Sequence, residues 1–218
     1  VLKVIILMKE RHYNWKYLLS ICLISAMGGL LFGYDWVVIG GAKPFYEPFF
    51  GIADNAAIQG WAMSCALIGC LAGALLSGWL SDRFGRKKLL ILSAGIFVIA
   101  SLGTGGAGSF LSFVFFRILG GIGIGLASNL SPMYIAEVTP GKVRGAFVSL
   151  NQLTIVIGIL AAQLINWRIA RPVPADSSVA DILASWNGQI GWRWMFYACT
   201  IPAALFFILM GVVHESPR

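Results

Sequence analysis

The sequence predicts an all-α membrane protein built as a bundle of six transmembrane helices. The hydrophobic share of residues is 58%, the charged share is only 11%, and the mean hydropathy is +0.82. Soluble domains contain about half apolar and a quarter charged residues, so a water-soluble core does not explain this composition. Runs of roughly 20 apolar residues, the length that crosses about 30 Å of hydrocarbon, occur six times along the chain.

The predicted spans occupy approximately residues 16–40, 57–80, 89–109, 112–136, 146–168 and 192–212. Residues 1–15 form a predicted cytoplasmic tail, residues 16–212 the bundle, and residues 213–218 the start of a cytoplasmic linker. The longest polar stretch is 169–191, where we expect an external loop. Trp186 in this stretch, and Trp192 and Trp194 just after it, suit a membrane interface.

Lys and Arg residues set the predicted orientation, because short loops that carry them stay on the cytoplasmic side. With the N-terminus inside, 11 of these residues fall in cytoplasmic parts and 4 in external parts. We therefore expect a multi-pass protein of the plasma (inner) membrane with both termini in the cytoplasm. The cytoplasmic cations are Lys3, Lys9, Arg11, Lys16, Arg83, Arg86, Lys87, Lys88, Lys142, Arg144 and Arg218, and the external ones are Lys43, Arg168, Arg171 and Arg193.

Small residues mark the second and fourth spans as helices that pack closely on their neighbours. The second span carries Gly69 and Gly73 at a spacing of four, followed by Ser77. Such a stripe lets two helix backbones approach each other. The fourth span is rich in glycine over residues 120–125 and then meets Pro132, which removes a backbone hydrogen bond and predicts a bend near its inner end.

Asp35 and Arg117 are the ionisable side chains that lie well inside predicted spans. Each costs about 2.5–3.5 kcal/mol or more at the bilayer centre unless it is paired or hydrated. Asp35 lies about six residues before the expected end of span one near Gly41, and Arg117 about five residues after Ser112, so both lie roughly 7–9 Å deep. We expect an ion pair. A carboxylate that changes protonation state suits proton coupling, and a static lock between two helices is the alternative.

The fifth span places Gln152, Ile159 and Gln163 on one helical face, at offsets of 7 and 11 residues. Amide side chains both donate and accept hydrogen bonds, which matches the hydroxyl groups of a sugar. Amides inside lipid also bind helices to one another. The residues alone leave these two interpretations even.

Charge and cysteine content exclude several other classes of function. The net charge of +7 is distributed between apolar runs instead of forming one basic face, so we expect lipid headgroups and no nucleic acid as the partner. The four cysteines fall inside apolar segments without a CxxC motif or a histidine cluster. We expect no metal site, no cofactor beyond a proton as coupling ion, and no enzymatic activity.

The turn between spans two and three, Gly78-Trp-Leu-Ser-Asp-Arg-Phe-Gly-Arg-Lys-Lys88, resembles the loop between helices 2 and 3 of the major facilitator superfamily. Further motifs resemble the sugar porter family of that superfamily, and together they cover nearly the whole chain. These motifs are Gly29-Leu-Leu-Phe-Gly-Tyr-Asp35, Arg117-Ile-Leu-Gly-Gly121, Pro132-Met-Tyr-Ile-Ala-Glu-Val-Thr-Pro140, Arg144-Gly145, Asn151-Gln152, Gly191-Trp-Arg-Trp-Met-Phe196 and Glu215-Ser-Pro-Arg218.

The resemblance implies the N-terminal half of a twelve-helix fold, with its six helices arranged as two inverted three-helix repeats. It also implies sugar transport by alternating access, with a monosaccharide such as xylose, glucose or galactose moved together with H⁺. Phe32 and Gln152 would line the sugar pocket, Asp35 would carry the coupling proton, and Arg117 would be its partner. The implied charge network of the inner gate consists of Asp82, Arg83, Arg86, Glu137 and Arg144.

Two departures from the family pattern leave alternatives open. His214 stands where the P-E-S-P-R signature has its first proline, without an obvious chemical consequence. The chain also contains six of the family's twelve helices, so a C-terminal half, covalent or separate, is an expected partner. A passive sugar facilitator and a non-transporting half, such as a truncated product, sensor or assembly module, are the alternatives to symport.

Overall fold

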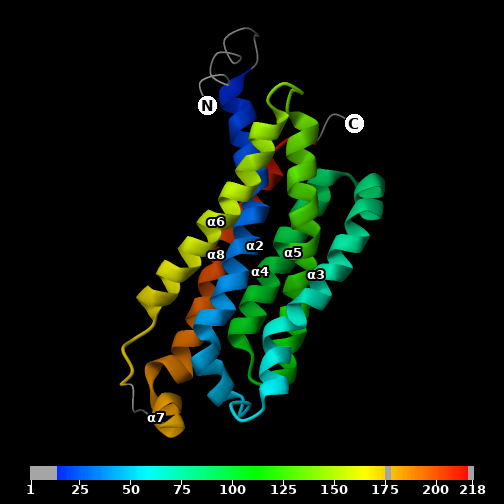
Figure 1. Cartoon of the computed structure of the whole chain (residues 1–218). Helices are drawn as coiled ribbons and strands as arrows, with labels where there is room; N and C mark the ends of the chain where they lie inside the picture. Colours follow the sequence, from blue (N-terminus) through cyan, green and yellow to red (C-terminus); the bar gives the residue numbers. More distant parts are fainter. Residues whose placement is uncertain (1–13, 175–177, 216–218) are drawn as a thin grey trace.

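The computed structural model describes residues 14–174 and 178–215, so most of the expected tail at 1–15 and half of the expected linker at 213–218 lie outside the described residues. The described chain forms long helices joined by short connections (Figure 1). They are α2 (Trp15–Phe49), α3 (Ala56–Phe84), α4 (Arg86–Gly106), α5 (Phe110–Val138), α6 (Arg144–Ile169) and α8 (Trp192–Val212), with the short α7 (Val179–Ala184) and the π-helical turn η1 (Asn187–Gly191) between the last two.

The prediction of six transmembrane helices is confirmed. Six helices of the described chain are long and apolar enough to cross a membrane, and each contains one of the predicted spans almost completely. Most predicted boundaries lie within about four residues of the observed helix ends. The length and position of the apolar runs were therefore sufficient to find the number, the order and the approximate length of the helices.

The first helix is longer than predicted, because α2 continues to Phe49 instead of ending near Gly41. Two prolines, which remove backbone hydrogen bonds, lie inside this last part. The helix continues because Tyr46 is fully buried and its ring centroid lies 5.1 Å from that of Phe113 in α5. Tertiary burial outweighs the local cost of the prolines. Asp35 thus lies 14 residues before the end of its helix, not about six.

The polar stretch 169–191 is not a plain loop, since it contains α7 and η1. Ser178 and Asp181 form a capping box that starts α7. The Asn187 side chain accepts from the Arg171 backbone nitrogen at 2.9 Å and donates to the Arg171 carbonyl at 2.8 Å. Asn187 is fully buried, so it fixes the return of the chain toward α8.

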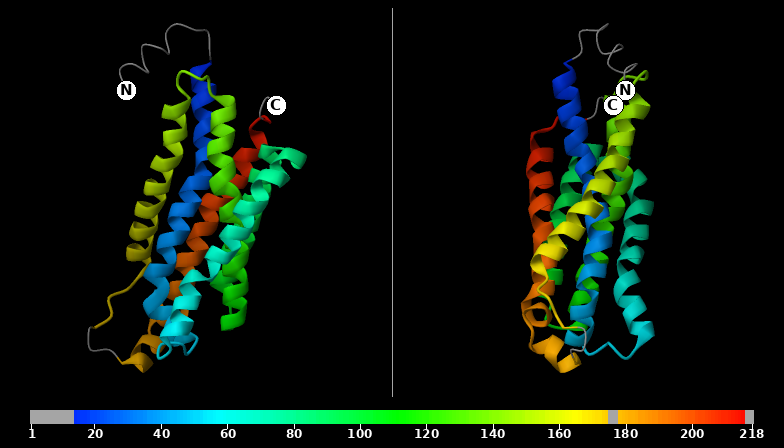
Figure 2. Two further views of the ribbon diagram at one scale, coloured as in Figure 1. Left: turned by 45° about the vertical axis from the view of Figure 1, so that its right-hand side comes forward. Right: turned by 60° about the vertical axis from the view of Figure 1, so that its left-hand side comes forward.

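The packing of the helices repeats itself within the bundle. In the first half of the chain α2, α3 and α4 follow one another, and in the second half α5, α6 and α8 do so. Helix α3 packs along α5, and α6, its counterpart, packs along α2, while α4 and α8 pack against each other (Figures 1 and 2). This exchange of partners is the arrangement expected of two inverted three-helix repeats.

The α3–α5 and α2–α6 crossings both depend on glycine. A Cβ atom at Gly69 of α3 would overlap the Ile118 carbonyl of α5, and a Cβ atom at Gly121 would overlap the Ala66 carbonyl of α3. Between α2 and α6, a Cβ atom at Gly33 would likewise overlap the Ile155 carbonyl. The predicted close approach along α3 is thus confirmed, and the same device joins α2 to α6.

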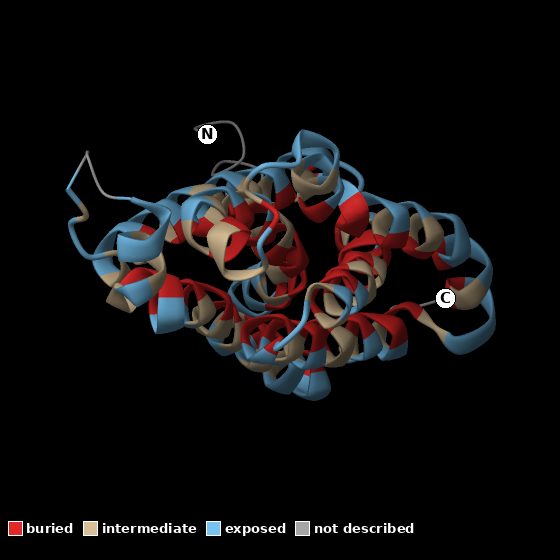
Figure 3. Ribbon diagram, turned by 90° about the horizontal axis from the view of Figure 1, so that it is seen from below, coloured by how far each residue is buried: buried red, intermediate tan, exposed pale blue. Residues whose placement is uncertain are grey.

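The start of α2 and the end of α8 lie at the same end of the bundle, together with the α3–α4 and α5–α6 connections (Figure 1). We call this end the basic end and the opposite end, which carries α7, the α7 end. The Tyr17 hydroxyl lies 2.7 Å from His214 Nδ1, so the first turn of α2 contacts the segment that follows α8. Seen along the bundle, buried residues face the spaces between helices and exposed ones cover its outside (Figure 3).

An aromatic cluster closes the bundle near the α7 end. The rings of Phe50, Phe113 and Trp192 lie with their centroids 5.3–6.3 Å apart. Arg193 donates from Nη1 to the carbonyls of Gly105 and Ala107 at 2.8 and 2.9 Å, where α4 ends. A cation at these free carbonyls is favourable. The cluster joins the ends of α2, α5 and α8, and Arg193 adds the end of α4.

Candidate functional site

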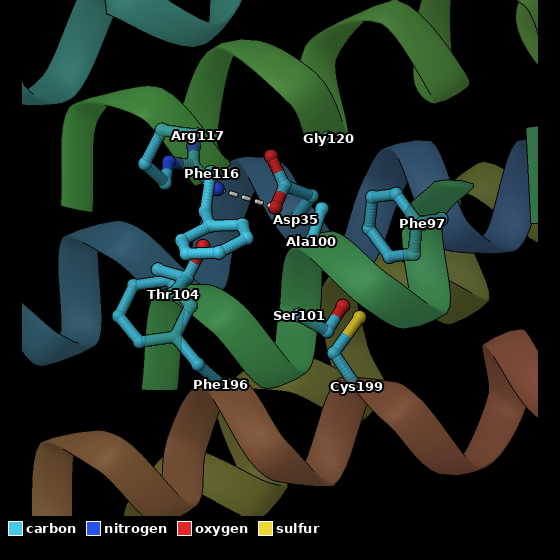
Figure 4. A pocket seen from close by; sticks show the side chains of 10 residues that line it. All are labelled: Asp35, Phe97, Ala100, Ser101, Thr104, Phe116, Arg117, Gly120, Phe196 and Cys199. Atoms are coloured by element: carbon cyan, nitrogen blue, oxygen red, sulfur yellow. Dashed lines mark hydrogen bonds and ion pairs between the residues drawn. The ribbon is translucent and has the colours of Figure 1, made fainter. Parts of the chain in front are cut away.

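The structure places the two ionisable residues of the predicted spans in direct contact. Arg117 Nη1 of α5 donates to Asp35 Oδ1 of α2 at 2.5 Å, although 82 positions separate them in sequence (Figure 4). Arg117 stands two turns into α5, whose first turn is capped by the Ser109 side chain accepting from the Ser112 backbone nitrogen. The pair joins the first helix of one repeat to the first helix of the other.

The Asp35–Arg117 pair is shielded from its surroundings. The side chains of Arg117 and Asp35 are only 4% and 11% exposed. The Arg117 guanidinium carbon lies 5.8 Å from the centroid of the Phe196 ring, an arrangement that favours a cation. Each charge depends on the other at this depth, because an isolated buried charge is strongly unfavourable. Protonation of Asp35 would remove the partner of Arg117.

A small cavity adjoins the pair on the side of α4 and α8 (Figure 4). Its volume for a water-sized sphere is about 10 Å³, close to the least that holds one water molecule. Polar groups of Ser101, Thr104 and Cys199 line it beside Asp35. Sequence reasoning missed these residues, because each alone has the appearance of an ordinary small residue of a packed helix. The cavity gives the carboxylate room for hydration without exposure to lipid.

The amides predicted for substrate binding lie on the exposed side of α6. Gln152 and Gln163 are exposed, and Ile159 is half-buried between them. The opposite side of α6 faces α2, where the Thr154 hydroxyl donates to the Ala26 carbonyl at 2.6 Å. Phe32, on α2, is half-buried. The chain therefore leaves the predicted amides free to meet a ligand or another part of a larger protein.

Arg86 is the centre of the charges at the basic end. Its Nη2 lies 3.0 Å from Asp82 Oδ1, its Nε lies 3.2 Å from Glu137 Oε1, and its Nη1 donates to the Ser81 carbonyl at 2.9 Å. The Arg86 side chain is only 6% exposed. Gly85, with a φ of +89°, supplies the backbone conformation that starts α4 at Arg86. Arg86 thereby connects α3, α4 and α5.

The other two cations of the predicted network do not join it. Within the described residues, neither Arg83 nor Arg144 lies within 4 Å of a carboxylate oxygen. Arg144 is exposed at the start of α6. Arg83 instead lies over the rings of Trp79 and Phe84, at 5.9 and 5.5 Å from their centroids. Among the described residues, Arg86 thus joins Asp82 and Glu137 in one cluster, and Arg83 and Arg144 lie outside that cluster.

Lys87 and Glu215 connect the start of α4 to the end of α8, a contact that the sequence did not predict. The Lys87 backbone nitrogen, at the start of α4, donates to Glu215 Oε1 at 2.9 Å, and Lys87 Nζ donates to the Gly211 carbonyl of α8 at 2.9 Å. A carboxylate at a helix start and a cation at a helix end both compensate the helix dipole. The Tyr134 hydroxyl adds a bond of 2.5 Å to the His214 carbonyl. The end of α8 is therefore held by α4, α5 and α2.

An all-helical bundle with inverted three-helix repeats and a charged pair inside its spans is the architecture of one half of a secondary transporter. A family model described as "Sugar (and other) transporter" matches residues 21–218. The chain belongs to this sugar transporter family of the major facilitator superfamily, whose members are transporters and not enzymes.

Relatives named as sugar transporters match along most of the chain. It is 41% identical to a D-xylose-proton symporter of Escherichia coli (strain K12) over 95% of this chain, and 41% identical to a glucose transport protein of Synechocystis sp. over 94%. A galactose-proton symporter of Escherichia coli (strain K12) is 37% identical over 96% of this chain. The chain spans less than half the length of these relatives, namely 45%, 42% and 41%.

Solved structures show the same architecture. The proton:xylose symporter XylE bound to 6-bromo-6-deoxy-D-glucose superimposes with a TM-score of 0.85 at 41% identity, covering 94% of this chain and 46% of that chain. The inward open conformation of XylE from E. coli gives a TM-score of 0.82 at 41% identity, covering 92% of this chain and 49% of that chain. The described bundle therefore corresponds to one half of a major facilitator fold.

Proposed function

We propose that this chain is the N-terminal half of a transporter that moves a monosaccharide together with a proton by alternating access. The observation that carries this proposal is the Asp35–Arg117 pair, because a carboxylate held inside a span by one cation can exist in a charged and a neutral state. The names of the relatives support a sugar of the xylose, glucose or galactose type as substrate.

Asp35 is the proposed proton carrier and Arg117 its partner. In the charged state the 2.5 Å contact joins α2 to α5, that is, one repeat to the other. When Asp35 binds a proton from the outer side, Arg117 loses its counterion, and the energy of the buried cation favours a different arrangement of these helices. Release of the proton on the inner side restores the pair. The protonation state is thereby linked to which side of the membrane the bundle faces.

The proposed sugar contacts are Phe32, Gln152, Ile159 and Gln163. The two amides are exposed on α6, where each can donate to and accept from sugar hydroxyls. Phe32 of α2 supplies an apolar surface. The remaining contacts would come from a C-terminal six-helix half, covalent or separate, which would also keep the exposed amides away from lipid.

The basic end is the proposed cytoplasmic side of a plasma membrane protein. Seven Lys and Arg residues of the described chain lie at this end and four toward the α7 end, a bias expected of loops that stay in the cytoplasm. We assign an inner gate to this end, formed by Asp82, Arg83, Arg86, Glu137 and Arg144. Arg86 joins Asp82 and Glu137 within this chain, and we assign to Arg83 and Arg144 contacts with carboxylates of the C-terminal half.

Uptake into proteoliposomes tests this function. The transporter that contains this chain is reconstituted, and uptake of labelled D-xylose, D-glucose and D-galactose is measured with and without an inward pH gradient. We expect the gradient to accelerate uptake of one of these sugars and Asp35→Asn to remove that acceleration while sugar exchange persists. If the rate of uptake is the same with and without the gradient, and is unchanged in Asp35→Asn, the Asp35–Arg117 pair is a static lock in a passive facilitator. No uptake of any of the three would leave a non-transporting half.

A further inference from the structure

A cleft between α2 and α6 opens on the surface of the bundle toward the α7 end. Its volume is about 390 Å³, within the range of 300–1,000 Å³ that small-molecule sites occupy. It is separate from the cavity beside Asp35, which lies toward α4 and α8. The lining residues are Trp36, Val37, Gly40 and Gly41 of α2 and Gln163 and Asn166 of α6.

Trp36 gives this cleft an aromatic wall. It follows Asp35 directly, yet it is 57% exposed while Asp35 is 8% exposed, since consecutive helix residues point to different faces. Gly40, one turn further on, leaves open space beside the indole, because a Cβ atom there would meet nothing within 4 Å. An exposed ring with free space over it is the surface on which the apolar face of a sugar ring stacks.

Two amides complete the cleft opposite this wall. Gln163 is exposed. Asn166 is 6% exposed, its Nδ2 lies 3.5 Å from the Val38 carbonyl, and its Oδ1 has no hydrogen-bond partner among the described residues. A buried amide oxygen without a partner is unfavourable. Rotation about the last torsion of Asn166, which is broad, would turn this oxygen to a hydroxyl donor in the cleft.

The cleft continues the face on which the proposed sugar contacts lie. Trp36 stands one helical turn beyond Phe32 on α2, and Gln163 one turn beyond Ile159 on α6, in both cases toward the α7 end. A sugar that enters from the α7 end and moves toward Phe32 therefore passes Trp36 first.

We propose that Trp36, Gln163 and Asn166 form an outer subsite that binds the monosaccharide before it reaches Phe32 and Gln152. The ligand class is a sugar that presents an apolar ring face to Trp36 and hydroxyl groups to the two amides. This inference rests on the proposed function, and it adds a binding step on the side of the α7 end. The competing occupant of the cleft is a helix of the C-terminal half, which would cover Trp36 permanently.

Quenching of tryptophan emission by acrylamide tests whether a sugar or a helix of the C-terminal half occupies the cleft. The transporter is compared with its Trp36→Phe variant, so that the difference in quenchable emission belongs to Trp36. We expect this difference to be present without sugar and to fall when D-xylose or D-glucose is added, but not with L-glucose. Two results would overturn the proposal. Either the transporter and its Trp36→Phe variant show the same quenchable emission without sugar, because another helix covers Trp36, or no sugar reduces the difference between them.

Uptake measurements give a second, independent readout. In oriented vesicles, Trp36→Ala should raise the half-saturating sugar concentration on the α7 side about threefold to tenfold, the range that aromatic contacts supply. The value on the basic side should change less than twofold, and Trp36→Phe should keep both values. Trp167→Ala is the matched control, since Trp167 is 76% exposed on α6 and does not line the cleft.

The two failures are distinguishable. If the unmodified transporter takes up no sugar, the proposed function fails. If it takes up sugar but Trp36→Ala changes neither side, or changes both sides equally, the outer subsite alone is refuted.

Discussion

Asp35 Oδ1 and Arg117 Nη1 lie 2.5 Å apart across the contact between the first helices of the two repeats. The contact is buried, and the cavity beside it has room for about one water molecule. A pair in such a place is costly to break from one side only, because the remaining charge keeps its desolvation penalty without a partner. The stability of the bundle and its proposed proton coupling therefore depend on the same two atoms.

The first prediction concerns the stability that this pair provides. Asp35→Leu and Arg117→Met should each destabilise the bundle by about 3–5 kcal/mol, because each leaves a buried charge alone. The double variant should lose clearly less than the sum, since an apolar pair replaces both charges. Thermal unfolding of the purified protein in detergent, arranged as a double-mutant cycle, measures the difference. Additive losses would mean that the two side chains do not act as a pair.

The second prediction concerns the glycine contact between α3 and α5. Gly69→Ala places a methyl group against the Ile118 carbonyl, so the helices must separate, at a cost of about 1–3 kcal/mol. Gly60→Ala is the matched control on the same helix, because a Cβ atom there meets nothing within 4 Å. We expect a lowered melting temperature for Gly69→Ala and no decrease for Gly60→Ala. Equal melting temperatures would show that the close approach is unimportant for stability.

The helices of this fold were predictable because they depend on a local property, the hydropathy of about 20 consecutive residues. The end of α2 was not, since Tyr46 and Phe113 come together only after folding and keep the helix going past two prolines. The start of α7 is different again. Its capping box, Ser178 and Asp181, is visible in the sequence as a spacing of three and was overlooked within a polar stretch.

The candidate site was predictable only where burial is costly. Asp35 and Arg117 were singled out because charges inside spans require a partner. Their meeting was expected from equal depths counted from an incorrect helix end, so the expectation rested on the pairing rule more than on the count. Contacts such as that of Lys87 with Glu215, 128 positions apart, leave no trace in spacing or composition. They follow from how α4 and α8 pack, which only the fold shows.

The third prediction concerns His214, which stands where the family signature has proline. The structure gives it a role, because its Nδ1 lies 2.7 Å from the Tyr17 hydroxyl at the start of α2. His214→Pro and Tyr17→Phe should each cost about 1 kcal/mol, the net value of one hydrogen bond. The double variant should lose no more than either single variant. A larger loss in the double variant, measured by thermal unfolding, would show that the two residues act separately.

The fourth prediction separates the two kinds of arginine at the basic end. Arg86→Gln removes the bonds to Asp82, Glu137 and the Ser81 carbonyl from a side chain that is 6% exposed, so a loss of about 3 kcal/mol is expected. Arg83→Gln is the matched control, because Arg83 lies outside that cluster, over the rings of Trp79 and Phe84. Its stability should change by less than about 1 kcal/mol.

The transport readout of these two variants completes that test. If Arg83 pairs with the C-terminal half when the inner gate is closed, Arg83→Gln weakens the outward-facing state without melting the bundle. The initial rate of uptake should then fall while the melting temperature stays near that of the unmodified protein. Arg86→Gln should lower both. Normal uptake in Arg83→Gln would remove this residue from the gate, and a melting temperature unaffected by Arg86→Gln would show that the cluster with Asp82 and Glu137 contributes little to the fold.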